Sequence, residues 1–171
     1  MFPRSLGTVN ELFAPPGNDW RPVSPALARL RRTVLVSVAG IALVITLVLG
    51  LVLETPVWPV LVVAALLVLV VAGGWVLIGR NARWWGYAER DEDLFIRHGA
   101  LFRTLVVVPY GRMQYVDVQA WPLEQAFKIA SVHLHTASPG TSARIPGLPA
   151  DEAARLRDRL TSLGHTQAAG L

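Results

Sequence analysis

Thr33-Val-Leu-Val-Ser-Val-Ala-Gly-Ile-Ala-Leu-Val-Ile-Thr-Leu-Val-Leu-Gly-Leu-Val-Leu53 carries no charged side chain, and residues 57–78 form a second uncharged run after the break Glu54-Thr55-Pro56. A helix needs about 20 apolar residues to cross the hydrocarbon core of a bilayer. Neither run has the polar face of a surface helix, and the remaining chain is too short to wrap a soluble core around both. The sequence therefore predicts two transmembrane helices, residues 33–53 and 57–78, joined by a tight turn.

The charges beside these runs predict how the helices are oriented. The basic residues that flank them are Arg29, Arg31, Arg32, Arg80 and Arg83, whereas the turn carries only the acidic Glu54. Because positive charge is retained on the cytoplasmic side, both termini are expected in the cytoplasm. Tryptophan prefers the membrane interface, and the tryptophans expected there are Trp58 at the outer end and Trp84 and Trp85 at the inner end.

Composition limits the rest of the chain. Of the 171 residues, 53% are hydrophobic, and the two runs explain that excess. Residues 1–28 contain five prolines and no sustained periodicity, so we expect a cytoplasmic arm that is extended or disordered. The absence of cysteine excludes a disulfide framework and a thiolate zinc site. The net charge of +4 is too small to indicate nucleic-acid binding and fits attraction to anionic lipid.

Beyond Arg83 the pattern changes from helical to alternating. It predicts strands at residues 85–90, 94–98, 101–108, 113–120, 131–136 and 141–145. From Pro149 to Gly164, apolar residues recur at helical spacing and predict an amphipathic helix, with residues 165–171 as a flexible tail. A curved antiparallel sheet or small barrel, with this helix over an open end or edge, is the expected fold of residues 85–164.

One stretch, Val107-Val108-Pro109-Tyr110-Gly111-Arg112-Met113-Gln114-Tyr115-Val116, contains the pattern Pro-x-x-Arg-hydrophobic-Gln-x-Val. Together with Arg97-x-Gly99-x-Leu101-x-Arg103, Ala130-Ser131-Val132-x-Leu134-x-Thr136-Ala137 and the helix at 153–156, it resembles the YdbS-like bacterial pleckstrin-homology (PH) membrane proteins. The resemblance implies a mainly-β PH-like roll or barrel, capped by a C-terminal helix, after two spans of a bacterial cytoplasmic membrane.

The chain departs from that family in one loop. Before Ala130 the family usually has an Arg and a Gly, where this chain has Gln125 and Lys128, so no role of the loop is carried over. The family's members have no well-defined activity. The resemblance therefore implies a fold rather than a function.

The candidate site residues in this domain are Arg103, Arg112 and Gln114. An arginine fork suits a lipid phosphate or a partner's carboxylate. In the structural interpretation, which we favour, Arg112 and Gln114 bond to turn carbonyls and Arg103 pairs with an acid such as Asp117.

Other chemistry finds little support. His133 and His135 share one face of a strand, but a metal site needs more ligands. The acidic residues from Glu89 to Asp93 lack the spacing of a calcium loop and fit a solvated turn. No nucleophile motif or phosphate-binding loop is present, so no catalytic residue, metal or cofactor is predicted.

These observations predict a non-enzymatic, membrane-anchored interaction or scaffold module at the inner leaflet. Its expected partners are membrane lipid and another membrane or membrane-associated protein; a relative with a related domain and a second copy of the chain are both candidates. The alternative is a lipid-headgroup-binding or envelope-stress and resistance factor. A transport or pore subunit is disfavoured, because neither run contains an ionisable residue.

Overall fold

The computed structural model describes residues 20–136 and 142–169, with side chains as far as Gly164. It contains two compact units. One is Ala28–Arg80, and the other combines the described parts of Met1–Leu27 and Asn81–Leu171. Most of the expected N-terminal arm, and the connection between the strands predicted at residues 131–136 and 141–145, lie outside the described residues.

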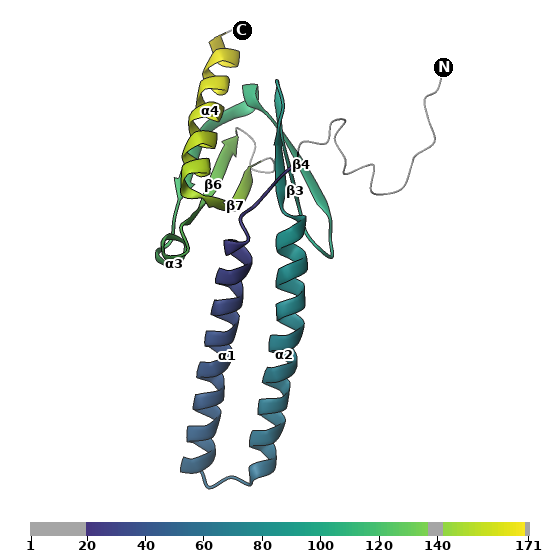
Figure 1. The fold of residues 1–171 in the computed structure, drawn as a ribbon, viewed down its shortest axis with the longest axis vertical. Coiled ribbons are helices and arrows are strands. Elements are labelled where there is room, and N and C mark those ends of the chain that lie inside the picture. Colours follow the sequence, from purple (N-terminus) through teal and green to yellow (C-terminus); the bar gives the residue numbers. More distant parts are fainter. Residues whose placement is uncertain (1–19, 137–141, 170–171) are drawn as a thin grey trace, which may run out of the picture. The chain divides into compact units, whose positions relative to one another are not determined.

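The first unit is a pair of transmembrane helices, α1 (Ala26–Val52) and α2 (Val57–Trp84), which lie side by side in Figure 1. They have mean hydropathies of 2.8 and 2.9, and none of either apolar window is buried within the protein. Both helices extend beyond the predicted spans at the ends that carry the arginines. The apolar side chains therefore face outward, as lipid-facing residues do.

Close packing of the two helices depends on two glycines. A Cβ added at Gly74 would lie 2.7 Å from Leu35 Cδ2, and one at Gly50 would lie 3.0 Å from Val60 Cγ2. A Cβ at Gly40 would meet nothing within 4 Å. Small residues permit such approach of helix backbones in a membrane.

The second unit contains two antiparallel sheets. The first has the strand order β1 (Arg21–Pro22), β2 (Gly86–Glu89), β3 (Asp93–His98) and β4 (Thr104–Pro109). The 3-10 turn η2 (Tyr110–Arg112) leads into the second sheet, with the order β5 (Met113–Gln119), β6 (Ile129–Thr136) and β7 (Ala143–Pro149). A short helix, α3 (Pro122–Ala126), which was not predicted, connects β5 to β6. The predicted mainly-β fold is thus confirmed as an open roll rather than a closed barrel.

The core lies between the sheets and α4 (Ala150–Ala169), as expected for a capping helix. The predicted helix stripe is confirmed: Ala153, Leu156 and Leu160 are fully buried. Their fully buried neighbours in the sheets include Leu94, Ile96, Val108, Val132, Leu134, Ile145 and Leu148.

The predicted end of this helix was wrong, because α4 continues past Gly164 to Ala169, into the segment predicted to be a flexible tail. A glycine terminates a helix where its backbone turns left-handed. Among the described glycines only Gly99 and Gly147 have positive φ, so Gly164 allows the helix to continue.

Residues on both sides of the hairpin build the second unit. Arg21 pairs with Tyr87 and Pro22 with Gly86, so this part of the segment that was expected to be extended or disordered is an extended strand. Just beyond, the Ser24 amide donates a hydrogen bond of 2.9 Å to the Gly147 carbonyl. One folded domain therefore contains residues from before α1 and residues from after α2.

The contact at Gly147 requires a glycine for two reasons. Its φ is +71°, in the left-handed region. A Cβ there would also lie 2.7 Å from Leu27 Cβ. Leu27 is only 3% exposed, so the first turn of α1 is part of the domain core.

Candidate interaction face

Alternation along the second sheet separates core residues from a polar face. The residues opposite the core are Tyr115, Asp117 and Gln119 on β5, Ser131, His133 and His135 on β6, and Arg144 on β7. Ser131 is itself fully buried, whereas the others are half-buried or exposed. We call this set the outer face of the β5–β7 sheet. Its β6 residues share one face, as the sequence predicted, because side chains in a strand alternate between the two faces.

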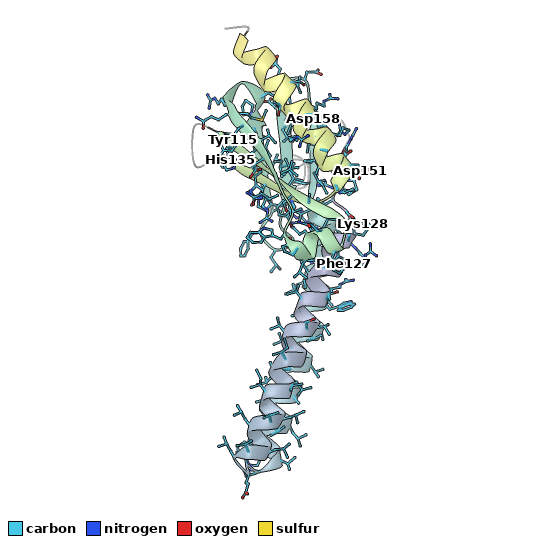
Figure 2. All side chains as sticks on the ribbon, turned by 90° about the vertical axis from the view of Figure 1, so that its left-hand side faces the viewer. Tyr115, Phe127, Lys128, His135, Asp151 and Asp158 are labelled. Carbon is cyan, nitrogen blue, oxygen red and sulfur yellow. The ribbon has the colours of Figure 1, made fainter. Side chains whose placement is uncertain are left out.

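One end of this face carries an aromatic pair. Tyr115 is opposite His135 in the strand register, and the two rings stack with centroids 4.2 Å apart and 12° between their planes. Figure 2 shows both residues on neighbouring strands of the sheet. Tyr115 is 57% exposed, so one side of the stack faces outward.

The middle of the face is a cross-strand row in which His133 lies between Asp117 and Arg144. Burial lowers the pKa of His133, and the nearby Arg144 charge lowers it further. The imidazole is therefore neutral at pH 7, and its buried Nε2 has no hydrogen-bond partner among the described residues. Gln119 Nε2 donates a hydrogen bond of 2.7 Å to Asp117 Oδ2. In the middle of the face, an imidazole thus lies between an acidic and a basic residue.

The other end of the face is held by Glu124 on α3. This buried carboxylate accepts hydrogen bonds from Ser131 Oγ at 2.9 Å and from the Trp121 amide at 3.0 Å. Arg144 donates to the same Ser131 Oγ at 3.0 Å and lies 3.7 Å from Glu124 Oε1. Because the carboxylate is satisfied, it fixes α3 against β6 rather than offering a reactive group.

Exposed apolar side chains lie at and just before α3, where the chain leaves β5. Trp121 is 64% exposed and Leu123 is 57% exposed. Figure 2 shows the α3–β6 connection at Phe127 and Lys128. Sequence reasoning missed α3, although proline in its first turn and Glu124 as an acceptor for the preceding amide are typical of a helix start.

A second group of charges joins α4 to the first sheet. Glu89, expected in a solvated turn, has a side chain only 8% exposed and forms ion pairs with Arg155 and Arg159. Arg155 also pairs with Glu152 at 2.9 Å, which in turn accepts a hydrogen bond from the Tyr87 hydroxyl. The expectation that Glu89 is solvated was wrong. Its two arginine partners are distant in the sequence, so the local pattern did not show that they pair with it.

Titration in this group follows from those contacts. The hydrogen bond from Arg155 is the largest influence that lowers the pKa of Glu152, to about 2. Burial and the Glu152 hydrogen bond raise the pKa of Tyr87 to about 12. The Glu152 carboxylate is therefore charged and the Tyr87 phenol is neutral at pH 7. The partners of both groups lie within the domain, so we interpret the group as structural.

The three candidate residues from the sequence do not form one site. Arg103 comes just before β4 and Arg112 just after it, so about 20 Å of strand separates them. Arg112 and Gln114 are exposed, and within residues 20–136 and 142–164 neither side chain makes the hydrogen bond to a turn carbonyl that we expected. The Arg103 guanidinium lies 4.0 Å above the ring of Trp84.

The residues assigned to the membrane interface lie at helix ends. Arg29, Arg31 and Arg32 are in the first turns of α1, and Arg80 and Arg83 are in the last turns of α2. The Arg32 guanidinium lies 4.5 Å above the Trp75 ring and donates to the Trp75 carbonyl. Trp58, at the opposite end of the hairpin, is 67% exposed.

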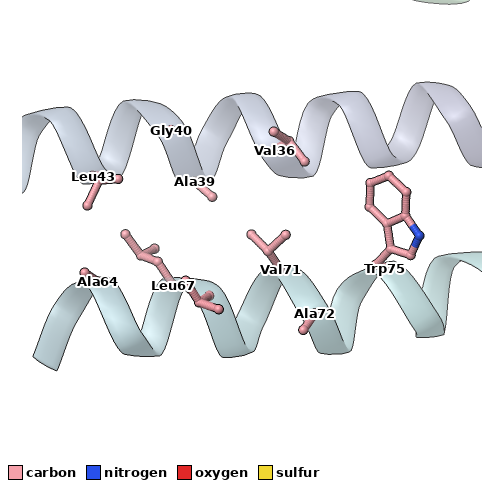
Figure 3. A pocket seen from close by; sticks show the side chains of 10 residues that line it. Val36, Ala39, Gly40, Leu43, Ala64, Leu67, Val71, Ala72 and Trp75 are labelled. Carbon is pink, nitrogen blue, oxygen red and sulfur yellow. The ribbon is translucent and has the colours of Figure 1, made fainter. Parts of the chain in front are cut away.

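A groove of about 490 Å³ lies between α1 and α2. Figure 3 shows its apolar walls, which include Ala39, Leu43, Leu67, Val71 and Trp75. Such a surface suits a lipid chain and supplies no catalytic group. In the described part of the chain, no three His, Asp or Glu side chains gather in a metal-binding cluster.

Comparison with known proteins gives a consistent result. A family model described as bacterial PH domain matches residues 26–163. The chain is 37% identical over 79 residues to the UPF0699 transmembrane protein YdbS of Bacillus subtilis (strain 168), a match that covers 46% of this chain and 48% of the relative. The chain thus matches about half the length of that curated protein. No solved structure matches it.

Proposed function

Because the chain belongs to the bacterial PH domain family, we propose that it is a non-enzymatic interaction module, anchored by two transmembrane helices, whose outer β5–β7 face binds another protein. The observation that carries this proposal is the chemistry of that face. Exposed aromatic groups at both ends, Tyr115 and Trp121, flank a polar row that includes Arg144. Aromatic residues and arginine are enriched at the energetic centres of protein interfaces.

The internal groups of the domain support binding over catalysis. Glu89, Glu124 and Glu152 have partners within the protein. The groove between the helices is apolar. A catalytic site needs convergent polar groups in a water-excluding pocket, whereas the outer face is a surface of paired side chains that suits a partner of complementary shape.

We place the domain at the inner leaflet of a bacterial cytoplasmic membrane. The arginines at the domain end of both helices support this side by the positive-inside rule. The chain contains no cysteine, so single-cysteine variants report cleanly. An impermeant thiol reagent should label Thr55→Cys in intact cells and leave Gly164→Cys unlabelled, and the reverse pattern would contradict the orientation.

Photocrosslinking tests the binding face. A benzophenone amino acid at Tyr115 or Trp121 in the full-length chain should form adducts with one protein of the membrane fraction in living cells. The same group at Thr161, which is exposed on α4, is the matched control. An adduct of twice the chain mass would identify a second copy as the partner. Equal yields at all three positions would contradict a specific face.

Affinity provides the quantitative test once the partner is identified. If Trp121 is an energetic centre, Trp121→Ala should weaken binding about 30-fold, because such residues contribute about 2 kcal/mol or more. Thr161→Ala should leave the affinity unchanged. Circular dichroism of both variants would show whether the fold is retained.

A further inference from the structure

The turn between β3 and β4, residues 99–103, exposes two large apolar side chains. Phe102 is 85% exposed and Leu101 is 70% exposed. No other large hydrophobic side chain in the described part of the chain is as exposed as Phe102, the lipid-facing Leu51 at 81% included. A soluble surface rarely leaves adjacent large residues so free of contacts.

The backbone of this turn is built to hold that shape. His98 pairs with Thr104 and closes the hairpin. Gly99 has φ +95°, and a Cβ at this position would lie 1.8 Å from the Phe102 carbonyl oxygen. Only glycine fits here. The turn is therefore a constrained structure that leaves both Leu101 and Phe102 exposed.

The residues at both ends of the turn contact tryptophans at the end of α2 and just after it. Arg103 lies over the ring of Trp84 at 4.0 Å, and Trp84 is the last residue of α2. On the other strand of the hairpin, His98 stacks on Trp85 with centroids 4.8 Å apart. Both ends of the turn thus contact the two tryptophans that follow the second span.

The depth of Trp84 follows from helix geometry. The uncharged run ends at Ile78, and α2 continues without interruption to Trp84. At 1.5 Å per residue this places Trp84 about 9 Å along the helix beyond that run. The headgroup region is roughly 5–8 Å thick on each side of the hydrocarbon core, so Trp84 lies at the outer edge of the headgroup region.

From these contacts we propose that the β3–β4 turn inserts into the lipid interface, with Leu101 and Phe102 among the upper acyl chains and Arg103 near the phosphates. We propose that the bilayer crossed by α2 covers this apolar surface, because both ends of the turn contact Trp84 and Trp85 at the end of that helix. Arg83, exposed one residue earlier, adds positive charge that anionic lipids attract. This contact is independent of any protein on the outer β5–β7 face.

A single fluorescent label tests the insertion. The full-length chain, reconstituted in vesicles of phosphatidylethanolamine and phosphatidylglycerol, would carry the label at Phe102→Cys. The references are Leu66→Cys, which is in the middle of α2 and 55% exposed, and Thr161→Cys, which is exposed on α4. We expect brominated lipid to quench the label at position 102 several-fold more than at 161, and iodide to do the opposite.

Two results would overturn the proposal. In one, the label at position 102 behaves like the label at 161 toward both quenchers. In the other, it is shielded from both, which would mean that protein covers the turn. As a second variant, Gly99→Ala in the labelled chain should reduce quenching by brominated lipid at least two-fold, with the strand content of the domain retained by circular dichroism; unchanged quenching would show that the turn geometry does not direct insertion.

Discussion

The hairpin and the PH-like domain use apolar residues in opposite ways. In the hairpin, leucine and valine point outward and none of the central windows is buried. In the domain, equally apolar side chains such as Leu156 and Ile145 are fully buried. In the hairpin, one apolar side chain can replace another because fluid lipid surrounds them. In the domain, each buried side chain must fit a closely packed core. Equal substitutions in the two regions should therefore have unequal effects.

The largest expected difference is between two leucines. Leu156→Ala removes a fully buried side chain of α4 and should reduce the free energy of unfolding by about 2–5 kcal/mol. Leu69→Ala, at a position 67% exposed on α2, should change it by less than about 0.5 kcal/mol. Urea denaturation of the full chain in detergent micelles, followed by tryptophan fluorescence, would compare them. Similar losses of unfolding free energy in the two variants would contradict the proposed difference between the domain and the hairpin.

A pair of glycines gives the next largest effect. Gly147→Ala forces a left-handed backbone on alanine and places its Cβ against Leu27, which should destabilise the domain by about 2–3 kcal/mol. Gly40→Ala meets open space in the hairpin and should be neutral or slightly stabilising. The same denaturation experiment measures both. If Gly147→Ala were neutral, residues 20–27 would not be held by the domain.

Acid should act on the domain through Glu152. Because the folded pKa of about 2 is below the ordinary value of 4.5, this carboxylate stabilises the fold above pH 4.5, and the contribution disappears as the pH falls toward 2. The side chain is 26% exposed, so solvent screening limits the loss to about 1–2 kcal/mol. Stability measured against pH should fall less steeply in Glu152→Gln. An unchanged slope would mean that other groups control the acid response.

The smallest effect is expected at Lys128. Its φ is +55°, in the region that favours glycine, and the resemblance to known sequences already pointed to a glycine in this loop. Lys128→Gly should stabilise the domain by about 0.5–1 kcal/mol, because the relief of strain exceeds the added chain entropy. Lys128→Ala serves as the control, since alanine keeps the strain, and an equal gain for both would implicate the charge instead.

The sequence predicted those parts of the fold that depend on periodicity. The two helices, the long strands and the buried stripe of α4 all repeat at a regular spacing. It missed β1 because Arg21–Pro22 becomes a strand only by pairing with β2 across the hairpin. It missed α3 because five residues are too few to show a helical period. Where an element depends on a distant partner, local pattern carries no signal for it.

Prediction of the sites had the same limit. The shared face of His133 and His135 followed from alternation, but the structural partners proposed for Arg103 did not include Trp84. The burial of Glu89 depends on Arg155, 66 residues later in the chain. The acidic residues next to Glu89 are typical of a solvated turn. Nothing in the neighbouring sequence distinguishes Glu89, which is buried, from these residues.

The pairing of β1 with β2 also sets an order of events during synthesis. The ribosome makes β1 first, and its partner follows only after about 60 further residues that form both spans. At a rate of protein synthesis of about 5–20 residues per second, β1 remains unpaired for roughly 3–12 seconds. If either span failed to insert, the two strands would end on opposite sides of the bilayer and the domain would never close. A domain that has folded, and therefore resists protease, thus indicates that both helices of the hairpin were inserted.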